Sequence, residues 1–252
     1  MTKIIEVYIF ELILIVSFLK CINNNEIILK IEGNGEQPIL NSEYQYIDQL
    51  ESILINGEPQ TYISHIALNL INPINMITLK WKSKLKDCYS MFYMLTNIIE
   101  VDLSNFDSSE VTNMGYMFLY CEGIKTINFN NYDTTSVKNM NSMFYDCKSL
   151  KSLDLSSFIT SSVTDMEYMF GECTNLEYLN LQNFDTSKVT SMSEMFCRCI
   201  NLTSLDISNF NTSIVTDMYH MFYECYKLTS INLKSFDTSN VKIMTGLFER
   251  CI

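Results

Sequence analysis

Histidine, glycine and basic residues are scarce in this sequence, and each scarcity excludes a class of function. The 252 residues include two histidines, His65 and His220, which are far apart and leave little for a histidine-based metal site or catalytic triad. The 7 glycines form no phosphate-cradling loop. Lys and Arg number 17 against 29 Asp and Glu, a net charge of −12 with no basic run, so nucleic acid is not an expected partner. We predict a protein that is not an enzyme and has no cofactor and no bound metal.

A period of 26 residues runs through most of the chain. It is kept by a phenylalanine, by the methionine before it, by a cysteine three residues after it and by a valine upstream. The phenylalanines are Phe92, Phe118, Phe144, Phe170, Phe196, Phe222 and Phe248, and the cysteines are Cys121, Cys147, Cys173, Cys199, Cys225 and Cys251. A fixed period of this length is the sequence signature of a solenoid.

One unit of the repeat predicts two elements. In the unit that begins at Val163, apolar residues at i, i+3, i+6, i+7 and i+10 predict one stripe on a short helix. Leu176–Leu181 then has the L-x-x-L-x-L spacing of a leucine-rich-repeat strand, and Asp185-Thr186-Ser187 predicts a turn. The predicted fold class is an α/β repeat solenoid that is leucine-rich-repeat-like, with one short strand and one short helix per 26-residue repeat and an N-terminal β cap.

Three regions follow from these patterns. Residues 1–22 are predicted to be a signal peptide or a hydrophobic N-terminal segment, because the apolar stretch Val7–Leu19 is short for a membrane span. The alternative is that they form an N-terminal strand or helix of the fold. Residues 23–84 are predicted to be a β-rich capping region, in which Asn56-Gly57 indicates a hairpin turn. Residues 85–252 form the leucine-rich-repeat-like array of about six repeats, the last one incomplete.

The cysteine column is predicted to be buried and reduced. Packed helices lie ~8–10 Å apart, whereas a disulfide needs Cα atoms within ~7 Å, so bridges between neighbouring repeats are not expected. Cys197 is out of register with the column and is predicted to lie nearer the surface and to react faster.

One polar column lies between the apolar positions of the predicted strands. It consists of Asp102, Asn128, Asp154, Asn180, Asp206 and Asn232. These side chains are candidate binding residues on an exposed strand face, either as a hydrogen-bonded ladder or as an acidic strip for a basic partner or Ca²⁺. Tyrosines gather on the predicted helical side, where they form either packing between helices or a protein-binding face.

The motif V-T-x-M-x-x-M-F-x-x-C-x-x-L-x-x-L-D-L-S-x-F-D-T-S, over residues 85–252, resembles the BspA-like leucine-rich-repeat surface proteins. The similarity is to their 26-residue branch, first noted in mycoplasma lipoproteins. The resemblance implies a non-catalytic secreted or cell-surface protein for cell adhesion and protein binding, with a protein or cell-surface partner. Membrane contact is then expected only through an uncleaved N-terminal segment. The alternative function is an intracellular protein–protein interaction scaffold.

The last predicted helix carries the apolar stripe of an interior repeat. Met244, Leu247 and Phe248 belong to that stripe. An uncovered end of this kind predicts self-association through the C-terminal end, or a chain that is a fragment of a longer array.

Overall fold

The computed structural model describes residues 25–60 and 67–251. The predicted signal segment, residues 1–22, lies outside the described residues. Within the described ranges, no helix is long and apolar enough to cross a membrane.

The described residues form ten strands and one short 3₁₀-helix. In chain order these are β1 (Glu26–Glu32), β2 (Gly35–Pro38), η1 (Ile47–Gln49), β3 (Leu50–Ile55), β4 (Glu58–Pro59), β5 (Ala67–Leu70), β6 (Ile74–Trp81), β7 (Ile98–Asn105), β8 (Thr126–Asn128), β9 (Ser152–Asp154) and β10 (Tyr178–Asn180).

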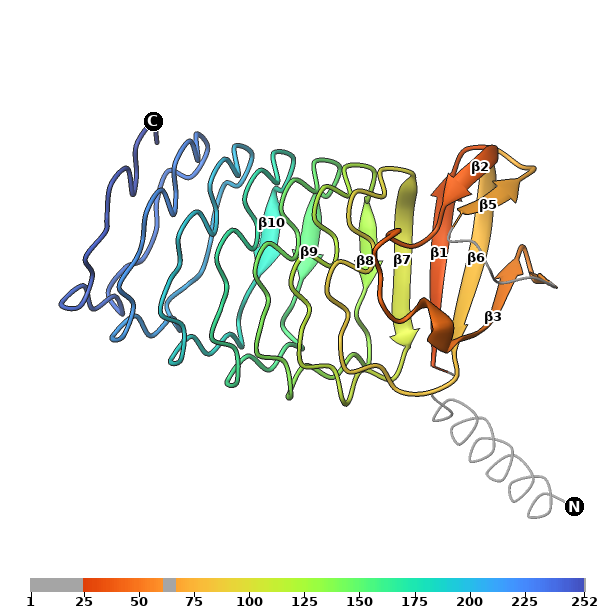
Figure 1. Ribbon diagram of the computed structural model, residues 1–252. Helices are drawn as coiled ribbons and strands as arrows, with labels where there is room; N and C mark the ends of the chain where they lie inside the picture. Colours follow the sequence, from red (N-terminus) through yellow and green to blue (C-terminus); the bar gives the residue numbers. More distant parts are fainter. Residues whose placement is uncertain (1–24, 61–66, 252) are drawn as a thin grey trace, which may run out of the picture.

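A mixed sheet joins the N-terminal region to the 26-residue units (Figure 1). Its order is β4-β3-β6-β1-β7-β8, in which β1 is antiparallel to both β6 and β7, while β7 and β8 are parallel. Alternate residues of β1 and β6 are buried, and Leu29 faces Ile77 across the strand pair. Asn56 and Gly57 have φ of 53° and 88° and form the predicted hairpin turn between β3 and β4. The N-terminal region and the first units therefore share one core.

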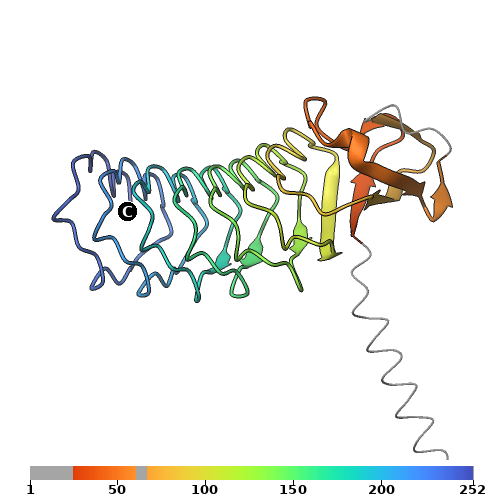
Figure 2. The same cartoon turned by 60° about the horizontal axis from the view of Figure 1, so that its bottom comes forward.

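The 26-residue units lie side by side in one row that starts at the N-terminal region (Figures 1 and 2). Strands β7 to β10 follow one side of the row, which we call the strand side. Tight double turns, which we call turn segments, follow the opposite side, the turn side (Figure 2). Parallel pairs β7–β8 and β9–β10 and single parallel bridges such as Asn113 to Asn139 connect neighbouring units.

The turn segments occupy the positions where the sequence predicts helices. In the unit that contains Phe118, the N–H of Met117 donates to the carbonyl of Met114, and the N–H of Cys121 donates to that of Phe118. Between them, the N–H groups of Phe118 and Tyr120 donate to the next unit, to the carbonyls of Met143 at 3.0 Å and Tyr145 at 2.9 Å, while that of Leu119 donates to Tyr116 within the unit. Tyr116 and Tyr120 have φ of 61° and 60°, a left-handed conformation that a right-handed helix cannot contain.

The predicted α/β repeat solenoid is therefore wrong. The chain is nearly all-β with mixed sheets, and residues 25–60 and 67–251 contain no α-helix. The leucine-rich-repeat strand prediction fails as well, because β8, β9 and β10 are three residues each and no strand is assigned between residues 181 and 251. The apolar spacing misled because the turn segment buries the same positions as a helix would: Val111, Met114 and Cys121 are all fully buried.

Phenylalanine rings form a continuous stack through the row. From Phe118 to Phe222, successive rings lie nearly parallel with centroids 5.5–5.8 Å apart. This spacing is close to the ~4.8 Å between neighbouring strands and far from the ~8–10 Å between packed helices. Offset stacking at this distance is favourable for aromatic rings. The units therefore pack at the separation that backbone hydrogen bonding sets.

Buried threonines in four successive units, Thr134, Thr160, Thr186 and Thr212, are hydrogen-bonded to the next unit. The hydroxyl of Thr186, which is fully buried, donates to the carbonyl of Asn211 at 2.9 Å and accepts from the N–H of Asn211 at 2.8 Å. Thr160 and Thr212 make the same pair of bonds to the residues 25 positions later. One side chain thus satisfies two backbone groups of its neighbour at a position where water has no access.

We predict that Thr186→Val destabilises the protein by about 1–3 kcal/mol, because it leaves a buried N–H and a buried C=O without partners. Thr186→Ser keeps the hydroxyl and loses one methyl group, for which about 0.8 kcal/mol is expected. Urea unfolding of the two variants and the wild type measures both effects. A loss for the valine variant no larger than that for the serine variant would show that the hydrogen bonds do not matter.

Candidate functional site

The structure brings the six predicted site residues together on the strand side. Asp102 pairs with Asn128 in the register of β7 and β8, and Asp154 pairs with Asn180 in that of β9 and β10. In each of the six, the side-chain oxygen accepts the N–H of the residue two positions later. The bonds run from Ser104 to Asp102, Asn130 to Asn128, Ser156 to Asp154, Gln182 to Asn180, Ser208 to Asp206 and Lys234 to Asn232.

These bonds give the column a role in the fold. The side chains form the tight turns that end each strand segment, and Asn128 also donates to the Asp102 carboxylate at 3.0 Å. The N–H of Ser156 lowers the pKa of Asp154, and hydrogen bonds from Ser208 lower that of Asp206. A binding role for the column stays a prediction. No group of three or more His, Cys, Asp or Glu side chains in the described residues could hold a metal ion.

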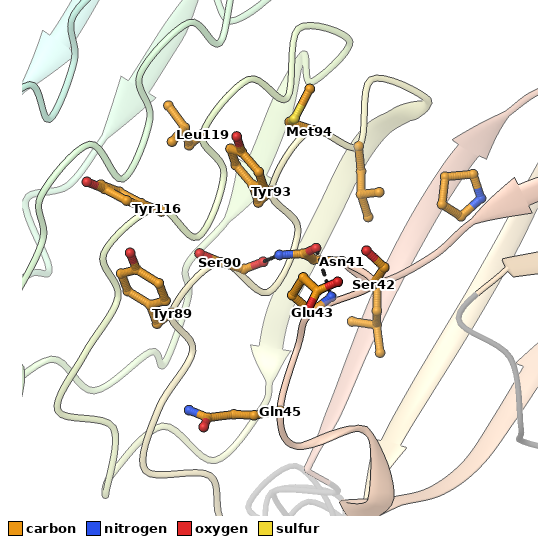
Figure 3. A pocket seen from close by; sticks show the side chains of 13 residues that line it. Asn41, Ser42, Glu43, Gln45, Tyr89, Ser90, Tyr93, Met94, Tyr116 and Leu119 are labelled. Atoms are coloured by element: carbon orange, nitrogen blue, oxygen red, sulfur yellow. Dashed lines mark hydrogen bonds between the residues drawn. The ribbon is translucent and has the colours of Figure 1, made fainter.

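A hollow lies on the other side of the molecule. It is a groove of about 760 Å³ between the segment 38–45 of the N-terminal region and the first two turn segments (Figure 3). One wall is aromatic and aliphatic, and consists of Tyr89, Tyr93, Met94, Tyr116 and Leu119. The opposite wall carries Ser42, Glu43 and Gln45.

The polar wall is fixed to the first turn segment by hydrogen bonds from Asn41. Its N–H donates to the carbonyl of Met91 at 2.9 Å, and its side-chain amide donates to that of Ser90 at 3.0 Å. The buried hydroxyl of Tyr44 donates to the carbonyl of Asp87 at 3.0 Å. Three hydrogen bonds, two from Asn41 and one from Tyr44, therefore hold the two walls at a fixed distance.

The aromatic wall is one end of a belt of tyrosines on the turn side. The rings of Tyr89 and Tyr116 lie 5.0 Å apart, and those of Tyr93 and Tyr120 lie 6.1 Å apart. The belt continues over the next units through Tyr120–Tyr145 at 5.7 Å and Tyr145–Tyr168 at 6.1 Å. Burial raises the pKa of Tyr89 and of Tyr145, so these phenols are neutral at physiological pH.

The groove is suited to binding. Its volume falls in the range of ~300–1,000 Å³ typical of ligand sites. Among the described residues that line it, Glu43 is the one formally charged side chain. The described lining residues include no histidine, cysteine or lysine. Aromatic faces, hydroxyls and one carboxylate can stack on a ligand and hydrogen-bond to it.

Sequence reasoning found the tyrosine cluster and missed the polar wall. Segment 38–45 precedes the repeats and shares none of their periodicity, so no pattern places it against residues 87–94. Tyr145 belongs to the belt as well. It lies over Gly171, where an added Cβ would come 2.9 Å from the ring, and that contact is visible only in three dimensions.

The cysteine column is buried from Cys121 to Cys225, as the sequence predicts, while Cys251 is partly exposed. The reasoning behind the prediction was wrong. The units stack at strand spacing, and the thiol of each column cysteine donates to a carbonyl 29 residues earlier, as Cys173 does to Phe144 at 3.0 Å. The prediction that Cys197 lies nearer the surface is also wrong. Cys197 is 4% exposed, and burial raises the pKa of its thiol. A buried, protonated thiol is a poor nucleophile.

We predict that Asp154→Ala lowers the free energy of unfolding at neutral pH by about 0.5–1.5 kcal/mol, because the N–H of Ser156 loses its acceptor. Asp154→Asn keeps an acceptor and changes stability less. The folded-state pKa of Asp154 lies below the unfolded value of ~3.9. Its charge therefore stabilises the fold above that value, and the contribution is lost as pH falls through the folded-state pKa. Urea midpoints at neutral and acidic pH measure this, and equal loss for the two variants at neutral pH would contradict the turn-forming role.

Comparison with known proteins identifies a family. A family model described as "Mycoplasma protein of unknown function, DUF285" matches residues 69–179 and 164–252, well over half of the chain. No curated protein and no solved structure matches. The resemblance to BspA-like leucine-rich-repeat proteins is wrong, because the repeat motif belongs to a different family model. The chain belongs to the family described as Mycoplasma protein of unknown function, DUF285.

Proposed function

We propose that this chain is a non-catalytic binding protein that holds a macromolecular partner in the turn-side groove of Figure 3. The observation that carries the proposal is the groove itself: an open hollow with one aromatic wall and one polar wall. Tyrosine is favoured in binding surfaces because it gives a large contact area and a hydroxyl at low entropic cost. Bonds from Asn41 and Tyr44 fix the walls before any partner arrives, which reduces the entropic cost of binding.

The belt extends the surface beyond the groove. Rings from Tyr120 to Tyr168 continue across successive units, so a long partner can make repeated contacts along the row. This favours a polymeric partner, such as a protein or a cell-surface chain, over a small metabolite. A second, independent part of the proposal is that the strand-side column, which consists of Asp102 and its equivalents, also binds the partner.

The proposed location is secreted or at the cell surface, which rests on the sequence pattern of residues 1–22. The alternative is an intracellular interaction scaffold. The described cysteines favour that alternative in one respect, since all eight are free thiols and reduced thiols are usual in reducing compartments. Seven of the eight are buried, however, and burial protects thiols in any compartment. N-terminal sequencing of the protein from its native host separates the two locations.

Peptide and glycan arrays test the binding function. We expect the wild type to bind members of one polymer class and Tyr89→Ala/Tyr116→Ala to bind them at least about tenfold more weakly, the usual loss for a central aromatic contact. Tyr178→Ala is the matched control, because Tyr178 is 53% exposed on the strand side.

Identical binding by the wild type and the groove variant, or no binding by the wild type, would contradict the proposal. Chemical conversion of a bound polymer would contradict the non-catalytic part of it. Urea unfolding of each variant confirms that the loss does not arise from unfolding.

A further inference from the structure

We infer that the groove binds an extended cationic polypeptide segment, with an arginine or lysine side chain placed between the tyrosine rings and the Glu43 carboxylate. This inference rests on the proposed function and adds the chemistry of the partner. Three features support it: the charge of the groove, a matching contact elsewhere in the same chain, and the direction of the tyrosine belt.

The formal charge of the groove lining is negative. Glu43 is exposed and is the one charged residue among the described lining residues. Lys148 and Arg198, which lie farther along the turn side, are already paired: Lys148 with Glu122 at 2.9 Å, and Arg198 with Glu224 at 2.8 Å. The whole chain has a net charge of −12, so long-range attraction also favours a positive partner.

The chain itself shows the contact that we propose for the ligand. The guanidinium of Arg250 lies over the ring of Tyr223, 5.7 Å from its centroid, and donates to the carboxylate of Glu224. Tyr223 occupies the same position in its unit as Tyr93 does in the groove, five periods of 26 residues earlier. The position equivalent to Arg250 is Tyr120. The tyrosine at the groove therefore has no arginine of its own chain from that position.

Cation–π attraction and a carboxylate together favour arginine. A guanidinium stacks on aromatic faces and at the same time donates hydrogen bonds in its plane. The rings of Tyr89 and Tyr116, 5.0 Å apart and tilted by 36°, offer such faces, and the polar wall with Glu43 lies opposite them in Figure 3. An uncharged glycan could stack on the rings and donate hydroxyl hydrogen bonds to the carboxylate, but it would gain no attraction between opposite charges.

The direction of the belt favours an extended segment. Its rings follow one another across successive units, and acidic side chains accompany them. Burial raises the pKa of Tyr145, and the nearby carboxylates of Glu172 and Glu194 add to this effect. A segment with basic residues at intervals would meet further tyrosine rings and the carboxylate of Glu194 as it leaves the groove, whereas Glu172 is already paired with Arg198 at 2.9 Å.

A charge-matched pair of peptides tests the inference. The probes are a short peptide of alternating glycine and arginine and the same peptide with citrulline, which keeps the shape of arginine without its charge. We expect the arginine peptide to bind at least about tenfold more tightly in fluorescence anisotropy, and added salt to weaken it. We expect Glu43→Gln to weaken it about three- to tenfold, and Tyr89→Ala/Tyr116→Ala to weaken both peptides.

The matched control is Glu177→Gln, which removes an exposed carboxylate from the strand side. It should leave the affinity within roughly twofold of the wild type, the effect expected of a remote surface charge. Equal affinity for the two peptides, or an equal loss for Glu177→Gln and Glu43→Gln, would overturn the inference. If the arrays show groove-dependent binding of glycans while the arginine peptide does not bind, this inference fails and the proposed binding function stands.

Discussion

Backbone hydrogen bonds between successive units are the contact on which the rest of the array depends. Along each turn segment, alternate N–H groups donate to carbonyls of the following unit, as Tyr116 does to Asn141 at 2.9 Å and Tyr120 to Tyr145 at 2.9 Å. The intervening N–H groups close local turns within the unit. Every unit therefore satisfies its own backbone only when a neighbour lies at strand spacing. Since a buried, unpaired backbone group is costly, this requirement sets the separation and the register together.

The side chains follow from that separation. At strand spacing, equivalent residues of adjacent units come into contact. A residue type is therefore stable in such a column only if it packs against its own kind or forms hydrogen bonds with the neighbouring unit. Phenylalanine stacks, the cysteine thiol reaches a carbonyl of an earlier unit, and threonine bonds to two backbone groups of the next one. One charged column alternates in sign from Glu172 onward instead: Arg198 lies between Glu172 and Glu224, and its guanidinium lowers the pKa of Glu224 to about 2. Tyrosine on the turn side meets tyrosine of the next unit, and the belt that contains the candidate site results from the same rule.

The sequence predicts which residues are buried better than it predicts the backbone that buries them. The valine, methionine, phenylalanine and cysteine columns are all in the core from Val111 to Cys225. The predicted helices are absent because a stripe at i, i+3, i+6, i+7 and i+10 also fits two consecutive turns with left-handed residues between them. Such residues are usually glycine or asparagine, whereas here Tyr116, Asp146 and Glu172 take that conformation. The interunit bonds, which no local propensity reports, make that conformation favourable.

The candidate site was predictable only in part. Its aromatic wall repeats with the units and was visible as a tyrosine cluster, whereas Asn41, Glu43 and Gln45 belong to a non-repeating segment that tertiary contacts bring to the groove. The bonds of the strand-side column to the backbone two residues later make the turns of the fold. Aspartate and asparagine in that pattern are thus stronger evidence for a turn than for a ligand site.

Scalar couplings across hydrogen bonds in the isotope-labelled protein test the central claim most directly. The structure predicts a coupling between the amide nitrogen of Phe118 and the carbonyl carbon of Met143 in the next unit, because these groups are bonded at 3.0 Å. The same pattern is expected for Phe144 with Met169 and Phe170 with Met195. A coupling from Phe118 to the carbonyl of Met114, four residues earlier, would indicate an α-helical turn and would contradict the claim that bonds between units hold this structure together.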